Sequence, residues 1–256
     1  MDFSDPVQMA VFFEIHSGLP REGPGIDAST LRALDAVRSR LPSGPVIADM
    51  ACGPGSSAIP LARALPDARI MAIDLVAAFV EETNRRASQA GVSDRIDARV
   101  ADMASPPCAP ASLDMIWCES GIYNLGVETA LETWRPLLKP EGCVVFNEVI
   151  WKLPEAERDA PVTAFWAEYP AMTTDGGVRS AITNAGYRLL EAFDLPDSDW
   201  WANYYDPIEA KLPALEARYA GNAAAEIVLQ EARHEIGIRR RYPAAYDYRF
   251  YCLERA

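Results

Sequence analysis

The sequence has 256 residues, of which 50% are hydrophobic, and a formal net charge of −13. This is enough for a sizeable core, while no apolar run reaches the ~18 residues that a membrane span needs. The negative charge makes DNA and RNA unfavourable partners, so we expect neither a nucleic acid nor a membrane as partner. Five scattered cysteines without a CxxC pair, and only two histidines, predict a cytoplasmic protein with free thiols and no metal site.

The first 150 residues alternate short apolar strands with helices. Asp27 is expected to be the N-cap of a helix that runs to about residue 40. Strands are then expected at 46–50, 70–74, 96–100, 113–118 and 143–149, and helices at 57–65, 77–90 and 127–138. This alternation predicts an α/β fold whose parallel strands, covered by helices on both faces, end at one edge of the sheet.

After residue 150 the alternation stops. Residues 151–175 predict a small helical insertion, followed by a helix at 177–185, a strand at 187–193, mainly helix over 206–241 and a last strand at 246–253. No segment has the composition of a linker. We therefore expect one domain over 1–256, with an N-terminal cap (1–44), a cofactor-binding half (45–150) and a substrate-side insertion with the C-terminal strands (151–256).

Residues 48–55, ADMACGPG, join an expected strand to an expected helix through a glycine turn. Gly53, Gly55 and Ala58 fit the pattern G-x-G-x-x-G/A, in which the glycines allow a tight turn and a close approach of backbone to ligand. Asp74 ends the next strand, where a carboxylate can accept both hydroxyls of a ribose. Together these features predict a cofactor that contains adenosine.

Two classes of cofactor share this arrangement, the nicotinamide dinucleotides and S-adenosylmethionine. Asp49 lies where a carboxylate can face an ammonium, directly or through water, and would disfavour a pyrophosphate. Asp102 and Met103, after the third strand, can accept from an adenine amine and cover the ring. The sequence also lacks a Tyr-x-x-x-Lys pair. S-adenosylmethionine is favoured, and an NAD(P)-dependent oxidoreductase and a non-catalytic binder of S-adenosylmethionine or S-adenosylhomocysteine are the alternatives.

Several motifs together resemble the class I S-adenosylmethionine-dependent methyltransferases over about residues 45–150. They are ADMACGPG, AIDL (72–75), ADM (101–103), LDMIWCESGIYNLG (113–126) and LLKPEG (137–142). A bacterial subgroup of small-molecule methyltransferases of uncharacterised substrate is more similar still, at REGPG (21–25), ESGIYNLG (119–126) and the W…YY…P segment near 200–207. The resemblance implies a Rossmann-like seven-stranded sheet of order 3-2-1-4-5-7-6 with the last strand antiparallel.

The same resemblance implies methyl transfer to a small-molecule N, O or S nucleophile by in-line displacement, with S-adenosylhomocysteine as product. Asp49, Gly53 and Gly55 would then meet the methionine moiety, and Asp74 the ribose. The adenine would lie against Leu75, Asp102 and Met103, and Glu119 near the amino-acid end and the reacting methyl group.

Further residues are assigned by their chemistry and their place in the chain. Arg21, in a rigid Gly-Pro-Gly loop, can grip the cofactor carboxylate. A general base is needed only for a hydroxyl or phenol acceptor, and the candidates are Glu119, Tyr123 and Glu148. The residues expected in the acceptor pocket are His16, Tyr123, Asn124, Trp151, Trp200, Trp201 and Tyr204. The aromatic cluster near 200–205 could equally anchor the C-terminal helices, and the sequence leaves open both the acceptor and whether the chain forms a homodimer.

Overall fold

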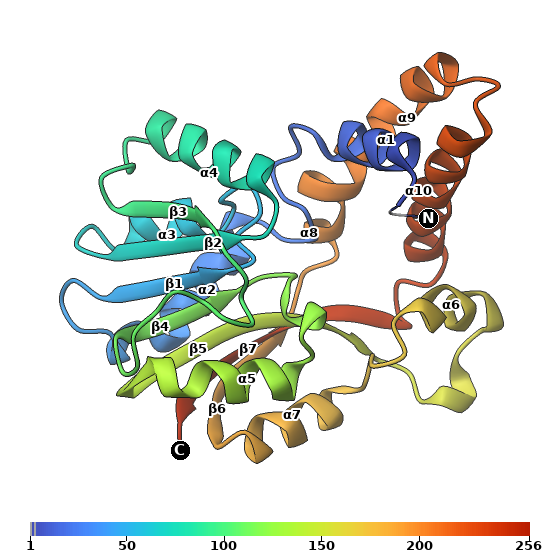
Figure 1. Cartoon of the computed structure of the whole chain (residues 1–256). Coiled ribbons are helices and arrows are strands. Elements are labelled where there is room, and N and C mark those ends of the chain that lie inside the picture. Colours follow the sequence, from blue (N-terminus) through green and yellow to red (C-terminus); the bar gives the residue numbers. More distant parts are fainter. Residues whose placement is uncertain (1, 3) are drawn as a thin grey trace.

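The computed structural model describes residues 2 and 4–256, and its centre is one seven-stranded sheet (Figure 1). The strand order is β3-β2-β1-β4-β5-β7-β6. The strands β1 to β5 are parallel, and β7 runs antiparallel to both β5 and β6. The strands are β1 (Val46–Met50), β2 (Arg69–Asp74), β3 (Ile96–Val100), β4 (Leu113–Cys118), β5 (Leu138–Trp151), β6 (Tyr187–Asp194) and β7 (Tyr246–Arg255). The predicted fold class and strand order are confirmed.

Helices cover both faces of this sheet. Every residue of β4 is buried, as expected for a strand that lies between two apolar layers. One layer packs α2 (Asp27–Val37), α3 (Ala58–Ala64) and α4 (Ala77–Gln89) on the sheet, and the other packs α5 (Val127–Trp134) and α7 (Asp175–Asn184). Figure 1 shows α5 and α7 side by side on their face.

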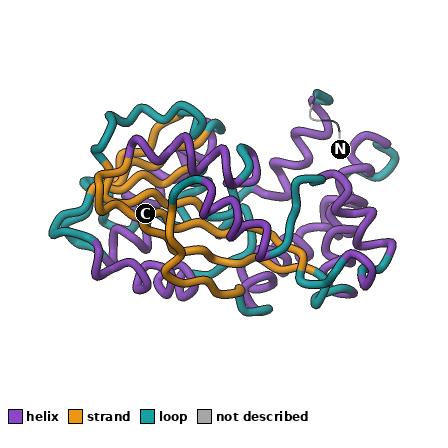
Figure 2. The backbone as a smooth tube through the Cα atoms, turned by 90° about the horizontal axis from the view of Figure 1, so that it is seen from below, coloured by secondary structure: helices purple, strands orange, loops and turns teal. Residues whose placement is uncertain are grey.

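A third group of helices lies beside the sheet rather than on a face of it (Figures 1 and 2). It consists of α1 (Pro6–His16), α9 (Asp206–Arg218) and α10 (Ala223–Arg241), which pack on one another, and α10 also contacts α6 (Ala160–Phe165) of the insertion. A short helix, α8 (Ser198–Trp200), and a π-helical turn (Trp201–Tyr205) lead from the sheet into α9. Among the described residues, none of the helices combines the length and apolarity needed to cross a membrane.

The expected N-terminal cap over residues 1–44 included helices, but no bounds were predicted for α1, although its start has a clear signal. Asp5 is its N-cap and accepts hydrogen bonds from the amides of Val7 and Gln8, and Pro6 occupies the first turn. The prediction that Asp27 caps α2 was wrong. Ile26 holds the N-cap position, and Asp27 is the first helical residue, with its carboxylate 3.2 Å from the Arg21 guanidinium.

The strand β5 also begins earlier than expected. Leu138 pairs with Leu113, but the next pair joins Cys143 to Met115, so residues 139–142 form an irregularity inside the strand. The remaining predicted strands match the observed ones to within two residues at either end.

Candidate active site

A cavity of about 730 Å³ lies at the edge of the sheet where the parallel strands end. The loops that follow β1, β2, β3 and β4 form one wall of it. The other wall comes from α1, the segment that follows α1, the π-helical turn and α10. Helices distant in sequence therefore enclose the edge at which α/β sheets bind ligands.

The glycine turn is held in a conformation that needs its glycines. Gly53 and Gly55 have φ angles of +53° and +83°. The Gly53 amide donates to Oδ2 of Asp74 at 2.9 Å, and its carbonyl accepts from the Thr83 hydroxyl at 2.8 Å. A Cβ atom on Gly55 would lie 3.0 Å from Cγ2 of Thr83. The turn is thus fixed from β2 and α4. Gly53 lines the cavity, whereas Gly55 lies outside its wall and packs against Thr83 of α4.

Asp49 is a fully buried carboxylate just behind this wall of the cavity. It does not line the cavity, but Ser57, which does, donates to its Oδ2 at 2.8 Å. Its Oδ1 has no hydrogen-bond partner among the described residues. Burial raises the pKa of Asp49 to about 8, which the Ser57 hydroxyl partly opposes and the charges of Glu119 and Asp74 reinforce. A cation close by would relieve this cost.

The four residues that the sequence predicts to bind adenosine, apart from the glycine turn, all line the cavity. The carboxylate of Asp74 accepts from the amides of Gly53 and Val76, each at 2.9 Å, and retains lone pairs for further donors. Leu75 is 66% exposed, which is unusual for a large apolar side chain and leaves it free to cover a ligand. Asp102 and Met103 line the same region from the loop after β3.

Arg21 and Glu119 form a buried ion pair between loops 98 residues apart, with 2.8 Å between Nη1 and Oε2. Glu119 also accepts from the Thr30 hydroxyl at 2.9 Å and from the indole of Trp117 at 2.8 Å. The Arg21 guanidinium further donates to Thr30 and to the Ser56 carbonyl, beside the glycine turn. Arg21, Thr30 and Trp117 thus bond to both carboxylate oxygens of Glu119, so it is a poor candidate for a general base.

Two glycines allow the loops behind this pair to touch. A Cβ on Gly23 would lie 2.7 Å from Cβ of Ser120, and one on Gly121 would lie 2.6 Å from Cβ of Ala51. Ala51 and Ser120 themselves have φ angles of +55° and +56°, which non-glycine residues seldom adopt. The REGPG and ESGIYNLG motifs therefore meet in space and form one wall of the cavity.

Four of the residues predicted for the acceptor pocket line the cavity: His16, Tyr123, Asn124 and Tyr204. The Nδ1 atom of His16 lies 2.7 Å from Oε2 of Glu22, and the His16 ring stacks on Phe12 at 4.2 Å. Asn124 donates to the Gly121 carbonyl at 3.0 Å.

Three predicted tryptophans lie outside the cavity wall, and the expectation that they line it is corrected. The Trp200 indole donates a hydrogen bond to Asp247 at 2.8 Å. The Arg239 guanidinium lies over the Trp200 ring, 4.0 Å from its centroid. Trp201 donates to Asp197, and Trp151 packs under Arg158. Successive side chains in the helical turns from residue 198 to 205 point in different directions, so only Tyr204 of the cluster lines the cavity.

Glu148 also lies outside the cavity wall. It is buried in β5, and its Oε1 accepts from the Val149 amide at 3.0 Å. Burial raises its pKa to about 8. Because its side chain does not reach the cavity, Glu148 could not take a proton directly from an acceptor bound there.

The sequence analysis missed several residues of the cavity wall. Glu22 could have been found, because it follows Arg21 in the REGPG motif. Glu235 of α10 had no local signal, and neither had Phe12, Phe79 or Glu168. Phe12 and Glu235 come from the helical group, Phe79 from α4 and Glu168 from the insertion, so only the tertiary packing brings them together.

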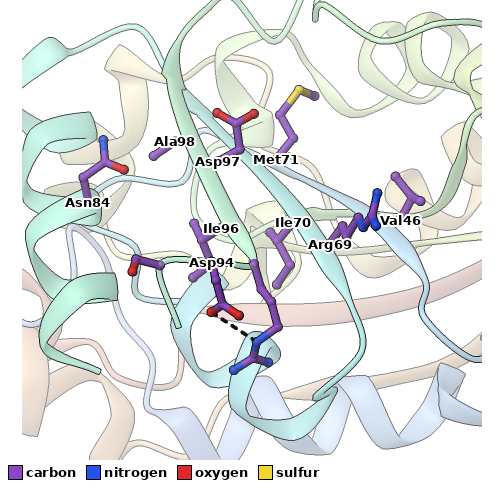
Figure 3. Close-up of a pocket in the computed structure, with 11 residues that line it drawn as sticks. Val46, Arg69, Ile70, Met71, Asn84, Asp94, Ile96, Asp97 and Ala98 are labelled. Carbon is purple, nitrogen blue, oxygen red and sulfur yellow. Dashed lines mark ion pairs between the residues drawn. The ribbon is translucent and has the colours of Figure 1, made fainter. Parts of the chain in front are cut away.

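A second hollow, of about 460 Å³, lies at the opposite edge, where β1, β2 and β3 begin (Figure 3). It contains the ion pair between Arg95 and Asp94, which the figure draws as a dashed line. Neither the glycine turn nor any of the predicted site residues contributes to it. The larger cavity is therefore the candidate active site.

The fold and this cavity define an α/β protein of the Rossmann-like methyltransferase architecture. Residues 47–142 match the Methyltransferase domain family, in agreement with the resemblance to the class I S-adenosylmethionine-dependent enzymes in the sequence.

Two relatives with assigned functions are similar in sequence. A dimethylglycine N-methyltransferase of Parasynechococcus marenigrum (strain WH8102) is 31% identical over 141 residues, which are 53% of this chain and 50% of that protein. A malonyl-[acyl-carrier protein] O-methyltransferase of Xylella fastidiosa (strain M23) is 27% identical over 86% of this chain and 70% of its own length. The chain thus spans only half the length of the first relative.

Among solved structures, an S-adenosylmethionine-dependent methyltransferase from Geobacter sulfurreducens in complex with S-adenosyl-L-homocysteine has the same fold. Its TM-score is 0.82 at 18% identity, over 96% of this chain and 98% of that one.

Proposed function

We propose that the protein transfers the methyl group of S-adenosylmethionine to a small-molecule acceptor by in-line displacement. The observation that carries the proposal is the cavity that joins the glycine turn, Asp74, Leu75 and Met103 within a matched methyltransferase domain. The two relatives named above are an N-methyltransferase and an O-methyltransferase with different substrates, so they support the reaction and leave the acceptor open.

The residues present fit this cofactor. The unpartnered Oδ1 of buried Asp49 suits an ammonium group, reached directly or through water. The exposed side chain of Leu75 suits a flat ring, which Met103 would cover and Asp102 would bind at its amine. Asp74 would hold the ribose. Gly53 and Gly55 would let the methionine moiety approach the backbone, while Arg21 would bind its carboxylate beside Glu119.

The chemistry that the cofactor supplies is a methyl group activated by a sulfonium. The protein has to align the acceptor and keep water out, and proximity and orientation can lower a barrier by roughly 7–11 kcal/mol. Phe12 and Tyr204, which face the strand ends from the helical group, would exclude water from the cavity. His16, Tyr123 and Asn124 would contact the acceptor. Of the three general-base candidates named from the sequence, Tyr123 fits best, because it lines the cavity and is 43% exposed.

Calorimetry with S-adenosylhomocysteine and with NAD tests the cofactor. We expect S-adenosylhomocysteine to bind and NAD not to bind. Asp74→Asn should weaken the binding by about tenfold or more, because hydrogen bonds to a charged group contribute about 1.5–3 kcal/mol. Binding of NAD instead would support the oxidoreductase. Incubation of metabolite extracts with isotopically labelled methyl donor then tests catalysis, and the lack of any labelled product would favour the non-catalytic binder.

We extend the proposal to the organisation of the protein as one cytoplasmic domain over residues 1–256 that does not bind nucleic acid. Support comes from a sheet that combines strands from 46 to 255 and from the net charge of −13. A homodimer is a further prediction, which light scattering coupled to gel filtration tests.

A further inference from the structure

The wall of the cavity that faces the strand ends combines carboxylates with aromatic rings. Phe12 and His16 of α1, Tyr204 of the π-helical turn and Glu235 of α10 contribute to it, with Glu22 from the segment that follows α1. Over the whole cavity the described residues supply six carboxylates: Glu22, Asp74, Asp102, Glu119, Glu168 and Glu235. Arg21 is the only lysine or arginine among those lining residues.

Arg21 is not available to an anionic acceptor. Its guanidinium is bonded to Glu119 at 2.8 Å and to Asp27 at 3.2 Å, and it lies at the glycine turn, where it donates to the Ser56 carbonyl. His16 lies 2.7 Å from the carboxylate of Glu22. The two basic groups of the cavity are thus each paired with an acid, and the remaining charge of the wall is negative.

Glu235 is the carboxylate best placed to bind a ligand in this region. Its Oε1 accepts from the Tyr205 hydroxyl at 3.0 Å, which fixes the side chain from its own helical group. Tyr204 lies next to it in the wall, with its ring 4.9 Å from that of Tyr205 and 6.3 Å from that of His16. Burial raises the pKa of Glu235, and a cation beside it would relieve that cost. A carboxylate among aromatic rings is the environment that stabilises an organic ammonium.

We propose that the acceptor is an amine that binds as its ammonium form, with Glu235 as its charged partner and with Phe12, Tyr123 and Tyr204 around its apolar part. The ammonium gives one proton to the Glu235 carboxylate, and the lone pair freed on nitrogen forms the new N–C bond as the bond from the methyl group to the sulfonium sulfur breaks. The products are the methylated amine, which carries the positive charge, neutral S-adenosylhomocysteine and protonated Glu235, which returns its proton to solvent. This inference rests on the proposed function and names the class of its acceptor. A carboxylate or phosphate ester of the same size would face the negative wall without a free cation, and it is excluded by repulsion. An uncharged alcohol would fit but would forgo the charged contact.

Isothermal titration calorimetry at neutral pH on the full chain saturated with S-adenosylhomocysteine tests the proposal. The probes are benzylamine, benzyl alcohol and benzoate, which share a ring and differ in charge. We expect the wild type to bind benzylamine about tenfold or more tightly than benzyl alcohol, and benzoate most weakly, because a charged hydrogen bond adds about 1.5–3 kcal/mol. Glu235→Gln should remove most of this preference. Glu141→Gln, an equal charge change on an exposed residue in β5 at the far edge, should keep it.

The titration of S-adenosylhomocysteine itself separates the possible failures. If a variant binds it as the wild type does, that variant is folded and its cofactor site is intact. If the wild type does not bind it, the proposed function fails. If the wild type binds it but shows no benzylamine binding, equal affinity for benzylamine and benzyl alcohol, or a preference that survives Glu235→Gln, the amine proposal is overturned.

Discussion

Replacement of Asp49 by asparagine tests the electrostatics of the site most directly. Asparagine keeps the shape of the side chain and an oxygen that can accept from Ser57, but it removes the charge. In the folded protein burial raises the pKa of Asp49 from 3.8 to about 8. In the unfolded chain the carboxyl group returns to its ordinary value.

The sign of the effect follows from the protons that each state binds. Between pH 4 and pH 8 the folded state keeps the proton on Asp49 and the unfolded state has lost it, so the ligand-free protein loses stability as the pH rises. The loss is about 1.4 kcal/mol per pH unit, or about 4 kcal/mol between pH 5 and pH 8. For a chain of this length that is roughly 10 °C in Tm.

Thermal unfolding of ligand-free wild type and Asp49→Asn at pH 5, 6, 7 and 8, followed by circular dichroism, measures this contribution. The Asp49→Asn variant should gain stability relative to the wild type as the pH rises. The control variant Asp67→Asn, at an exposed position, should show the same pH dependence of stability as the wild type. Parallel profiles for wild type and Asp49→Asn would falsify the raised pKa. The same variant should bind S-adenosylhomocysteine about tenfold or more weakly, because a neutral amide does not balance an ammonium.

Two further changes separate the binding site from its support. Gly55→Ala places a Cβ 3.0 Å from Thr83 at a φ of +83°. It should therefore lower the free energy of unfolding by about 1–3 kcal/mol, measured by urea unfolding, and weaken S-adenosylhomocysteine binding. Wild-type values in both assays would contradict the described turn. Trp200→Phe removes the hydrogen bond to Asp247 and should lower the free energy of unfolding by about 1–3 kcal/mol. S-adenosylhomocysteine and the acceptor probes should bind to this variant as they bind to the wild type. A selective loss of probe binding would show that Trp200 belongs to the acceptor pocket after all.

The wall of the cavity at the ends of the parallel strands could be predicted because its signals are local in the chain. A strand, a glycine turn and a helix follow one another within residues 46–64. Asp74 is the last residue of β2, and Met103 lies in the loop that follows β3. Parallel strands end at one edge, so residues at their C-terminal ends are neighbours whatever the details of packing. The same argument placed Glu119, although not its ion pair with Arg21.

The wall that faces the strand ends was predicted less well, because it depends on how separate elements pack. The aromatic cluster near residue 200 was treated as one unit, yet Trp200 packs against Arg239 and Tyr204 lines the cavity. A helical turn sends neighbouring side chains in different directions, and only the position of the turn relative to the sheet decides which of them meets the cavity.

The sequence by itself determined the Rossmann-like sheet and the residues that the strand ends bring to the cavity, since strand alternation and turn chemistry are properties of short segments. Only the tertiary structure decided what faces them, by bringing Glu235 of α10 and His16 of α1 across from the strand ends. The burial of apolar surface between distant helices drives that arrangement, and no short segment encodes which polar side chains it leaves at the cavity.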